Sequence, residues 1–246
     1  AEQMSEADPD AIHRVRVGLR RQLAAALREE LQSTYAAFAV SGPYSPDANS
    51  AGRRSLRNVC LGYLGELGDA DARALVVQQF ERADNMTDSI AAMSALAQYV
   101  WPERARALAH AYQRWRHGAL VLDKRLAVQA SSRLAGTLAE VRALMGHAAF
   151  DIRNPNKVRA LVSSFCHGNQ VRFHAADGTG YAFCAEQVSA LDPLNPQVAA
   201  RLARSFDRWR KFDAGRQAHA RAALERIRST PNLSRDTLEV VSRALA

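Results

Sequence analysis

Apolar residues recur at every third or fourth position along most of the chain, a spacing typical of amphipathic α-helices. The first such stretch begins at Asp8-Pro9, where a residue that can cap a helix precedes the residue best suited to its first turn. Its apolar positions are Ile12, Val15, Leu19, Leu23, Ala26, Leu27, Leu31, Tyr35 and Phe38. The pattern predicts one long helix from Asp8 to Phe38.

Similar patterns predict further helices, joined by short connectors, through the rest of the chain. Their approximate ranges are 50–67, 72–80, 85–100, 102–115, 120–129, 137–145, 154–165, 181–191, 195–209, 213–227 and 234 to the end. No segment alternates apolar and polar residues as a strand does. We predict an all-α fold, a superhelical stack of antiparallel helix pairs (armadillo/HEAT-like), as a single all-helical domain over 1–246. Because no sequence signature recurs at a fixed period, a single helical bundle is the alternative.

Three polar, turn-forming clusters interrupt the helices between residues 154 and 202. Asn154-Pro155 and Asn195-Pro196 each combine a helix-capping residue with a proline suited to the first helical position. An arginine follows each pair within one or two turns. Between them, the segment 177–180 reads Asp-Gly-Thr-Gly, which predicts a turn whose glycines adopt positive φ, with Thr179 or Gly180 capping a helix at Tyr181. We expect the functional surface in this region.

The chain carries a net charge of +8, and all but three of its 33 basic residues are arginine. This skew, with the abundant alanine, is typical of a GC-rich codon bias rather than of a polybasic surface. The basic residues between 201 and 216 are interrupted by Asp207 and Asp213, which favours a solvated helix face over a nucleic-acid interface. Nucleic acid is therefore not an expected partner.

The cysteines indicate a reducing environment. Cys60, Cys166 and Cys184 form no Cys-x-x-Cys pair, and their neighbours are apolar, which predicts buried thiols. Residues 1–6 are polar and show no signal-peptide pattern, and no apolar run is long enough to span a bilayer. We expect a cytoplasmic protein without a membrane partner.

Catalytic chemistry finds little support in the histidines and cysteines. No two of the seven histidines lie four residues apart, as the two histidines of a zinc-peptidase helix would. His110 and His117, like His167 and His174, are seven apart and would share a face if both lay on one helix. Cys166 precedes His167, but sequence neighbours rarely form a nucleophile–base pair, so a buried thiol is favoured.

Arg159, Gln197 and Arg201 are the remaining candidates for function. Arg159 follows Val158 and Arg201 precedes Leu202, so both arginines should flank the buried stripes of their helices. At such positions a guanidinium can point into a groove and bind a carboxylate or a peptide carbonyl. A salt bridge to a neighbouring helix explains the spacing equally well.

Seven short segments of the sequence together resemble one known family. They lie at 55–61, 85–88, 118–124, 154–159, 173–181, 195–202 and 243–246. The most specific read Asn-Pro-Asn-Lys-Val-Arg at 154–159 and Asn-Pro-Gln-Val-Ala-Ala-Arg-Leu at 195–202. Together they resemble the C-terminal helical domain of bacterial aminopeptidase N, a family of zinc-dependent metallopeptidases. The resemblance implies that this chain is the last domain of a longer hydrolase that removes N-terminal amino acids from peptides.

The same resemblance implies a non-catalytic role. The chain lacks the family's His-Glu-x-x-His zinc motif and its Gly-x-Met-Glu-Asn motif, so zinc and catalysis are expected in the catalytic domain of the same polypeptide. In the family, the helical domain closes an internal cavity over the active site and gates and orients the peptide substrate. The matching segments implicate Arg159, Gln197 and Arg201 as substrate-channel residues that contact the peptide beyond the scissile bond. The alternative is a free-standing helical-repeat scaffold that binds a protein partner.

Overall fold

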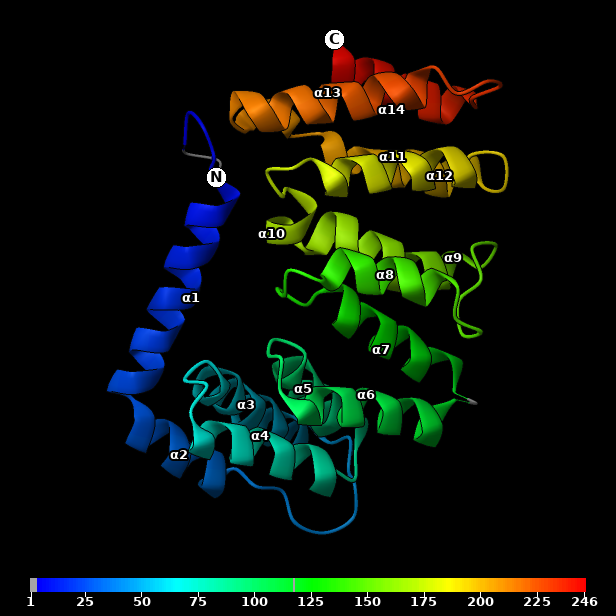
Figure 1. The fold of residues 1–246 in the computed structure, drawn as a ribbon. Coiled ribbons are helices and arrows are strands. Elements are labelled where there is room, and N and C mark those ends of the chain that lie inside the picture. Colours follow the sequence, from blue (N-terminus) through cyan, green and yellow to red (C-terminus); the bar gives the residue numbers. More distant parts are fainter. Residues whose placement is uncertain (1–3, 117) are drawn as a thin grey trace. The chain divides into compact units, whose positions relative to one another are not determined.

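The computed structural model describes residues 4–116 and 118–246, which form helices, turns and loops without any strand (Figure 1). The predicted all-α class is confirmed. These residues group into two compact units. We call Arg14–Gly118 the N-terminal unit, and residues 4–13 together with 119–246 the C-terminal unit. The assignment of 1–246 to a single domain stays a prediction.

The N-terminal unit is a stack of helices around an aliphatic core. Its helices are α1 (Pro9–Ala26, from Arg14 onward), α2 (Arg28–Ala37), α3 (Ala48–Gly65), α4 (Ala70–Arg82), α5 (Met86–Leu96) and α6 (Pro102–Trp115). Helix α3 packs against α2, α4 and α5, and α5 also contacts α4 and α6. Asp47, Asp69 and Asn85 cap α3, α4 and α5 by accepting a backbone N–H bond from three residues on.

The predicted long helix from Asp8 to Phe38 is divided, because α1 ends at Ala26 and α2 begins at Arg28. The spacing of the apolar residues predicted helix correctly, but it does not indicate burial along α1. Val15, Leu19, Leu23 and Leu27 are 68%, 55%, 39% and 45% exposed. Four large apolar side chains at intervals of four residues therefore form an exposed stripe, which we call the α1 stripe.

The C-terminal unit stacks helices in successive layers. Its elements are α7 (Ala119–Ala130), α8 (Thr137–Met145), α9 (Pro155–Val158), η1 (Arg159–Gly168), α10 (Gln170–Phe173), α11 (Thr179–Leu191), α12 (Pro196–Ala203), η2 (Arg204–Phe206), η3 (Trp209–Lys211), α13 (Ala214–Arg228) and α14 (Arg235–Leu245). Figure 1 shows the α11–α12 layer beside the α13–α14 layer, and α11 contacts α13 while α12 contacts α14. Below them, η1 packs on α7 and α8.

Aromatic side chains fill the centre of the C-terminal unit. Phe173 meets the rings of Phe165, Tyr181 and Phe206 at centroid distances of 6.5, 5.3 and 5.9 Å, with steep interplanar angles. Phe165 meets Phe183 in the same manner at 5.5 Å. These rings are at most 1% exposed. Edge-to-face contacts of this kind add about 0.5–1.5 kcal/mol each beyond the burial of apolar area.

Residues 7–10 are bonded to the last third of the chain. The Ala7 N–H donates to the Lys211 carbonyl at 2.6 Å. Asp10, in the first turn of α1, forms an ion pair with Arg216 of α13. Arg216 also donates to Asp213 at 2.6 Å and to the His174 carbonyl at 2.7 Å. The start of α1 is therefore part of the C-terminal unit.

Two predicted helices have a different form in the structure. Residues 154–165 form one α-turn (α9) followed by the wider π-helix η1, which extends to Gly168. Residues 195–209 form α12 followed by short 3₁₀ turns. Apolar spacing predicts a helix in both segments but does not distinguish the α form from the π or 3₁₀ form.

The Asp-Gly-Thr-Gly turn also differs in detail from its prediction. Only Gly178 has positive φ, at 72°, and helix α11 already begins at Thr179, so neither Thr179 nor Gly180 is the cap. Asp177 accepts hydrogen bonds from the Thr179 N–H at 3.0 Å and from its hydroxyl at 2.7 Å. Gly180 has another role: a Cβ there would lie 2.2 Å from the Phe173 carbonyl oxygen. Glycine is required at 180 because two backbone segments pass this close.

Candidate functional site

Arg159 is the first residue of the π-helix η1. Asn154 caps the preceding turn by accepting the Asn156 N–H bond at 3.0 Å, and Pro155 occupies the first helical position. Val158 is fully buried, as predicted, and the neighbouring Arg159 is exposed. The Arg159 guanidinium donates to Asn156 Oδ1 at 3.3 Å, a neutral acceptor.

Gln197 and Arg201 lie four residues apart on α12, and both are exposed. Asn195 caps this helix by accepting the Val198 N–H bond at 3.1 Å. Leu202, next to Arg201, is 1% exposed and holds α12 against the core. Among the described residues, neither the Gln197 amide nor the Arg201 guanidinium has a hydrogen-bond partner.

Helices η1 and α12 pack together, and His167 near the end of η1 contacts Ser205 of η2, which follows α12. The Ser205 hydroxyl lies 3.2 Å from His167 Nδ1. Desolvation lowers the pKa of His167, opposed by a hydrogen bond to the Arg201 backbone carbonyl and by the charge of Asp207. The ring is therefore neutral at pH 7. No hydrogen bond within the described part of the chain joins Arg159 to Gln197 or Arg201; the three residues share only this pair of packed helices.

The alternative explanation for the two arginines was a salt bridge to a neighbouring helix. Neither Arg159 nor Arg201 forms an ion pair with any carboxylate that the structure describes. Lys157 differs from both, since its ammonium lies 2.7 Å from Asp123 Oδ1 and 3.3 Å from the Ala119 carbonyl. Lys157 therefore fastens α9 to α7, whereas Arg159 and Arg201 keep their charges available to a ligand.

The basic residues between 201 and 216 do not form one solvated face. Arg216 is only 7% exposed and forms ion pairs with Asp10 and Asp213. Arg210 donates to the Ala244 and Leu245 carbonyls at 2.7 and 2.9 Å, and so caps the end of α14. The expectation of a solvated face is wrong at Arg216, which is buried, whereas Arg210 is exposed as expected.

The cysteine and histidine patterns supply no nucleophile in the described residues. Cys166 is 1% exposed, and burial next to Cys184 raises the pKa of its thiol well above 9.0. His167 and His174 share no helix face, because η1 ends at Gly168 and a new turn begins at Gln170. His117, the partner of His110 in the other pair, lies outside the described residues.

His174 belongs to the buried structure. Its Nδ1 lies 2.8 Å from the Tyr181 hydroxyl, and its Nε2 lies 3.1 Å from Gln170 Oε1. Burial, together with the nearby charge of Arg216, lowers the pKa of His174 to about 4. Burial also raises the pKa of Tyr181. Both groups stay uncharged near neutral pH.

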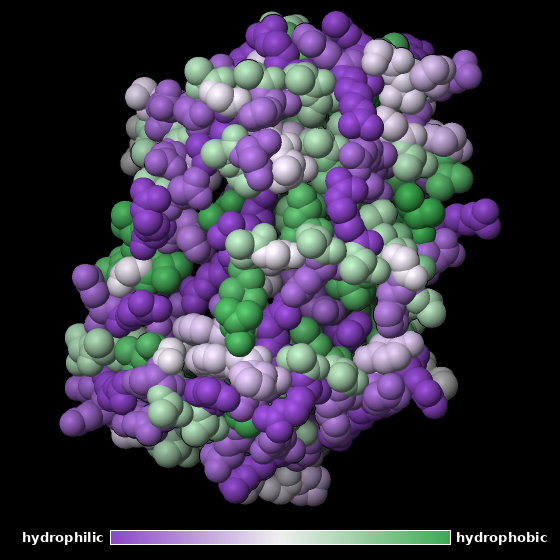
Figure 2. Space-filling view, viewed as in Figure 1, coloured by the Kyte–Doolittle hydropathy of each residue, from purple (hydrophilic) through white to green (hydrophobic). Residues whose placement is uncertain are grey.

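A metal ion would find no ligand set in the part of the chain that the structure describes. Within residues 4–116 and 118–246, no group of three or more His, Cys, Asp or Glu side chains converges on one point. None of the described helices has the length and apolar character to cross a membrane. On the face in view, Figure 2 shows hydrophobic residues in separate groups among hydrophilic ones.

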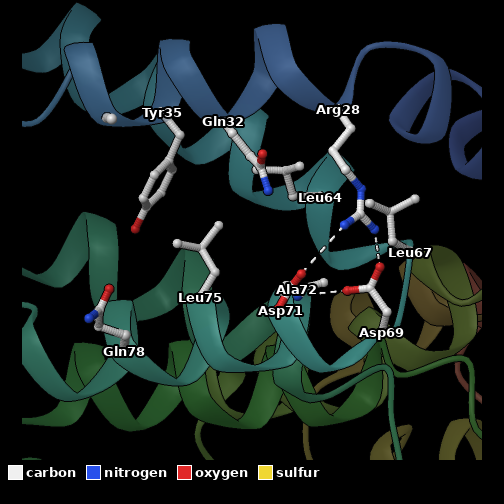
Figure 3. A pocket seen from close by; sticks show the side chains of 11 residues that line it. Arg28, Gln32, Tyr35, Leu64, Leu67, Asp69, Asp71, Ala72, Leu75 and Gln78 are labelled. Carbon is white, nitrogen blue, oxygen red and sulfur yellow. Dashed lines mark hydrogen bonds and ion pairs between the residues drawn. The ribbon is translucent and has the colours of Figure 1, made fainter.

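A cavity of about 340 Å³ lies in the N-terminal unit, and none of the candidate residues lines it. Its floor is apolar and includes Leu64, Leu67 and Leu75. Figure 3 shows Arg28 of α2 reaching toward Asp69 and Asp71, with which it forms ion pairs across the cavity. Because Arg28 already pairs with both carboxylates, these charges are not free to bind a ligand.

The fold defines the class of protein: an array of stacked helices, of the type found in armadillo repeats, with no metal cluster in its described residues. The family model described as "Domain of unknown function (DUF3458_C) ARM repeats" matches residues 1–246. The chain belongs to this family.

Relatives confirm the resemblance to aminopeptidase N. The chain is 42% identical over 241 residues to "Aminopeptidase N" of Escherichia coli (strain K12), a match that covers 97% of the chain and 27% of that protein. It is 40% identical over 239 residues to "Aminopeptidase N" of Caulobacter vibrioides, with 97% and 28% covered. The chain therefore spans little more than a quarter of the length of these relatives.

A solved structure supports the fold. The crystal structure of Legionella pneumophila aminopeptidase A in complex with aspartic acid matches with a TM-score of 0.89 and 30% sequence identity. The match covers 99% of this chain and 29% of that one.

Proposed function

We propose that this chain is the non-catalytic C-terminal domain of a zinc-dependent aminopeptidase. In this role it closes the internal active-site cavity and orients the peptide through Arg159, Gln197 and Arg201. The observation that carries the proposal is the state of these three side chains. All are exposed, and neither arginine is neutralised by a described carboxylate, on a chain whose relatives are aminopeptidases.

The chemistry of the three side chains suits a peptide. Guanidinium groups donate to carbonyl and carboxylate oxygens, and the Gln197 amide can both donate and accept. A charge-assisted bond to a peptide carbonyl or C-terminal carboxylate contributes about 1.5–3 kcal/mol. Such contacts position a substrate and provide neither a nucleophile nor a proton acceptor.

The described residues hold no group of three or more side chains that could bind a metal ion. The proposal therefore assigns the metal and the hydrolytic step to a catalytic domain elsewhere in the same polypeptide. The exposed α1 stripe supports a larger assembly, because contiguous apolar surface commonly marks an interface. The cytoplasmic location expected from the sequence is kept in this proposal, and the three free, buried cysteines agree with it.

Kinetics of the full polypeptide test the channel role. Arg159→Ala and Arg201→Ala should each raise KM for a tetrapeptide by about tenfold, the equivalent of 1.4 kcal/mol, with a smaller change in kcat. An aminoacyl p-nitroanilide has no peptide beyond the leaving group, so its KM should change by less than about twofold. Gln197→Ala should show the same pattern with a smaller effect, because the contact it removes is uncharged.

Arg228→Ala is the matched control, since Arg228 is an exposed arginine near the end of α13, with no partner among the described residues. It should leave both substrates unaffected. Equal kinetics of wild type, Arg159→Ala and Arg201→Ala on the tetrapeptide would refute the channel role.

A further inference from the structure

A second group of arginines surrounds a cavity of about 200 Å³ in the N-terminal unit. Arg54 and Arg57 come from α3, and Arg82 is the last residue of α4. The loop before α3 contributes Tyr44, and the segment after α4 contributes Asp84. Three guanidinium groups thus line one small space.

Arg54 lacks a counter-charge. Its residue is only 4% exposed, yet its guanidinium donates to an uncharged acceptor, the Ser45 carbonyl, at 2.7 Å. The guanidinium also lies 4.8 Å from the centre of the Tyr44 ring. Among the described residues it forms no ion pair. Because burial of an unpaired charge is costly, this arrangement favours an anion in the cavity.

Arg57 is also incompletely satisfied. One of its terminal nitrogens donates to the Tyr35 hydroxyl at 2.9 Å, and the other lies 3.8 Å from Asp88 Oδ2. Its Nε–H is buried and has no acceptor in the described part of the chain. Asp88 is shared with two other donors, the Asn58 and Asn85 amides, at 2.8 and 3.0 Å. This carboxylate therefore only partly neutralises Arg57.

The charges around the cavity leave a positive excess. Arg82 is exposed and has no partner among the described residues. The two carboxylates, Asp84 and Asp88, both accept from the Asn85 amide, and they oppose three guanidinium groups. Guanidinium groups bind carboxylate and phosphate oxygens through paired N–H donors, which matches a compact space rimmed by arginines.

We propose that this cavity binds a small oxyanion, a carboxylate or a phosphate group, held by Arg54, Arg57 and Arg82. The bound anion supplies the counter-charge that the buried Arg54 lacks. The site shares no residue with the peptide-contacting surface of Arg159, Gln197 and Arg201. Its test is a binding measurement, so its outcome is separate from that of the kinetic test above.

Isothermal titration calorimetry of the full polypeptide at low salt tests the site with three probes. Inorganic phosphate represents one source of the anion, and N-acetyl-alanyl-alanine represents the other. N-acetyl-alanyl-alanine amide keeps the peptide but lacks the carboxylate. We expect saturable millimolar binding of phosphate, of the acid, or of both, and none of the amide. The relative affinity of the two anions identifies the preferred source.

Variants assign the binding to this cavity. Arg54→Gln and Arg82→Gln should each lower the affinity for the anion by about tenfold. Since Arg54 is buried, the exposed Arg82 provides the variant that should fold normally. Arg16→Gln is the matched control, an exposed arginine of α1 with no described partner. It should bind as the wild type does, and so should Arg201→Ala, which removes the other candidate anion contact.

Two results would overturn the proposal. One is the absence of saturable binding of both phosphate and N-acetyl-alanyl-alanine. The other is binding that is unchanged in Arg82→Gln, or equally weakened in Arg16→Gln, since either outcome would place the anion elsewhere or make it a general charge effect.

Discussion

The two units use their aromatic residues in opposite ways. In the C-terminal unit, Phe165, Phe173 and Tyr181 are among the largest fully buried side chains, whereas the N-terminal unit fills its centre with leucines such as Leu61 and Leu96. In the N-terminal unit, guanidinium groups stack on tyrosine and tryptophan rings. Examples are Arg20 on Tyr63, Arg57 on Tyr35 and Arg73 on Trp101.

This difference separates two ways of stabilising stacked helices. A core of interlocking rings depends on exact shape, so it tolerates little change in volume. A leucine core bordered by arginines and amides depends on satisfied polar groups, whose loss costs less per contact. The same type of substitution should therefore change the free energy of unfolding by different amounts in the two units.

The largest effect is expected where the C-terminal unit has least space. Gly180→Ala should lower the free energy of unfolding by about 3–4 kcal/mol, because a Cβ there would lie 2.2 Å from the Phe173 carbonyl oxygen. Gly52→Ala in α3 is the matched control, since a Cβ at that helical position meets nothing within 4 Å. It should stabilise the N-terminal unit by about 0.5–1 kcal/mol. Urea unfolding measures both, and equal effects would refute the contrast.

Acid should weaken the C-terminal unit through His174. Its pKa is about 4 in the folded protein against 6.5 as the ordinary value, so the unfolded chain binds more protons between these pH values. The contribution of neutral His174 to the free energy of unfolding is therefore fully present above pH 6.5. It is lost as the pH falls toward 4, by about 3 kcal/mol at 1.36 kcal/mol per pH unit. His174→Gln should flatten this part of the pH profile of unfolding. A profile identical to that of the wild type would contradict the assignment.

An intermediate effect is expected from the polar network of the N-terminal unit. Gln79 is 3% exposed, accepts from the Tyr35 hydroxyl at 2.9 Å and donates to Asn58 at 2.7 Å. Gln79→Leu removes one bond from the buried Tyr35 hydroxyl and one from the partly buried Asn58 amide, and should cost about 1–3 kcal/mol. The neighbouring Gln78 is exposed, so Gln78→Leu should be nearly neutral in the same denaturation experiment. Similar losses from the two substitutions would show that the network contributes little.

The smallest effect on stability is expected in the α1 stripe. Leu19→Gln and Leu23→Gln remove exposed apolar groups and should change the free energy of unfolding by less than about 0.5 kcal/mol. If the stripe docks on another part of a longer polypeptide, the same pair should weaken that interface, measurable as increased proteolysis of the full-length protein. A large loss of stability in the 246-residue chain itself would instead show that the stripe is part of its core.

The sequence predicted most helices because their starts are chemically marked. Asn85, Asn154 and Asn195 all cap where expected, and α8 has the predicted bounds of Thr137–Met145. The break at Leu27 and the π-helix η1 were missed, since neither carries a proline or glycine signal and both depend on packing against neighbours.

Prediction of the candidate functional residues from the sequence was limited in the same way. Arg159 and Arg201 lie beside the buried Val158 and Leu202, as their spacing predicted, and both are exposed. The burial of Arg54 was not predicted, because it depends on a loop folding over α3 and leaves no trace in the local pattern of a polar stretch. One sequence signal for a shared site exists: Arg54 and Arg57 are three residues apart, which places them on one helix face.

The bond between Asp10 and Arg216 has a consequence for the order of assembly during synthesis. Residues 4–13 leave the ribosome before the N-terminal unit, but their partners near Lys211 and Arg216 emerge only after the whole of that unit has been made. The N-terminal unit is thus an insertion that can fold early, while the C-terminal unit must wait to close. Residues 4–13 lack these partners throughout that interval, and their bonds to Lys211 and Arg216 can form only after it.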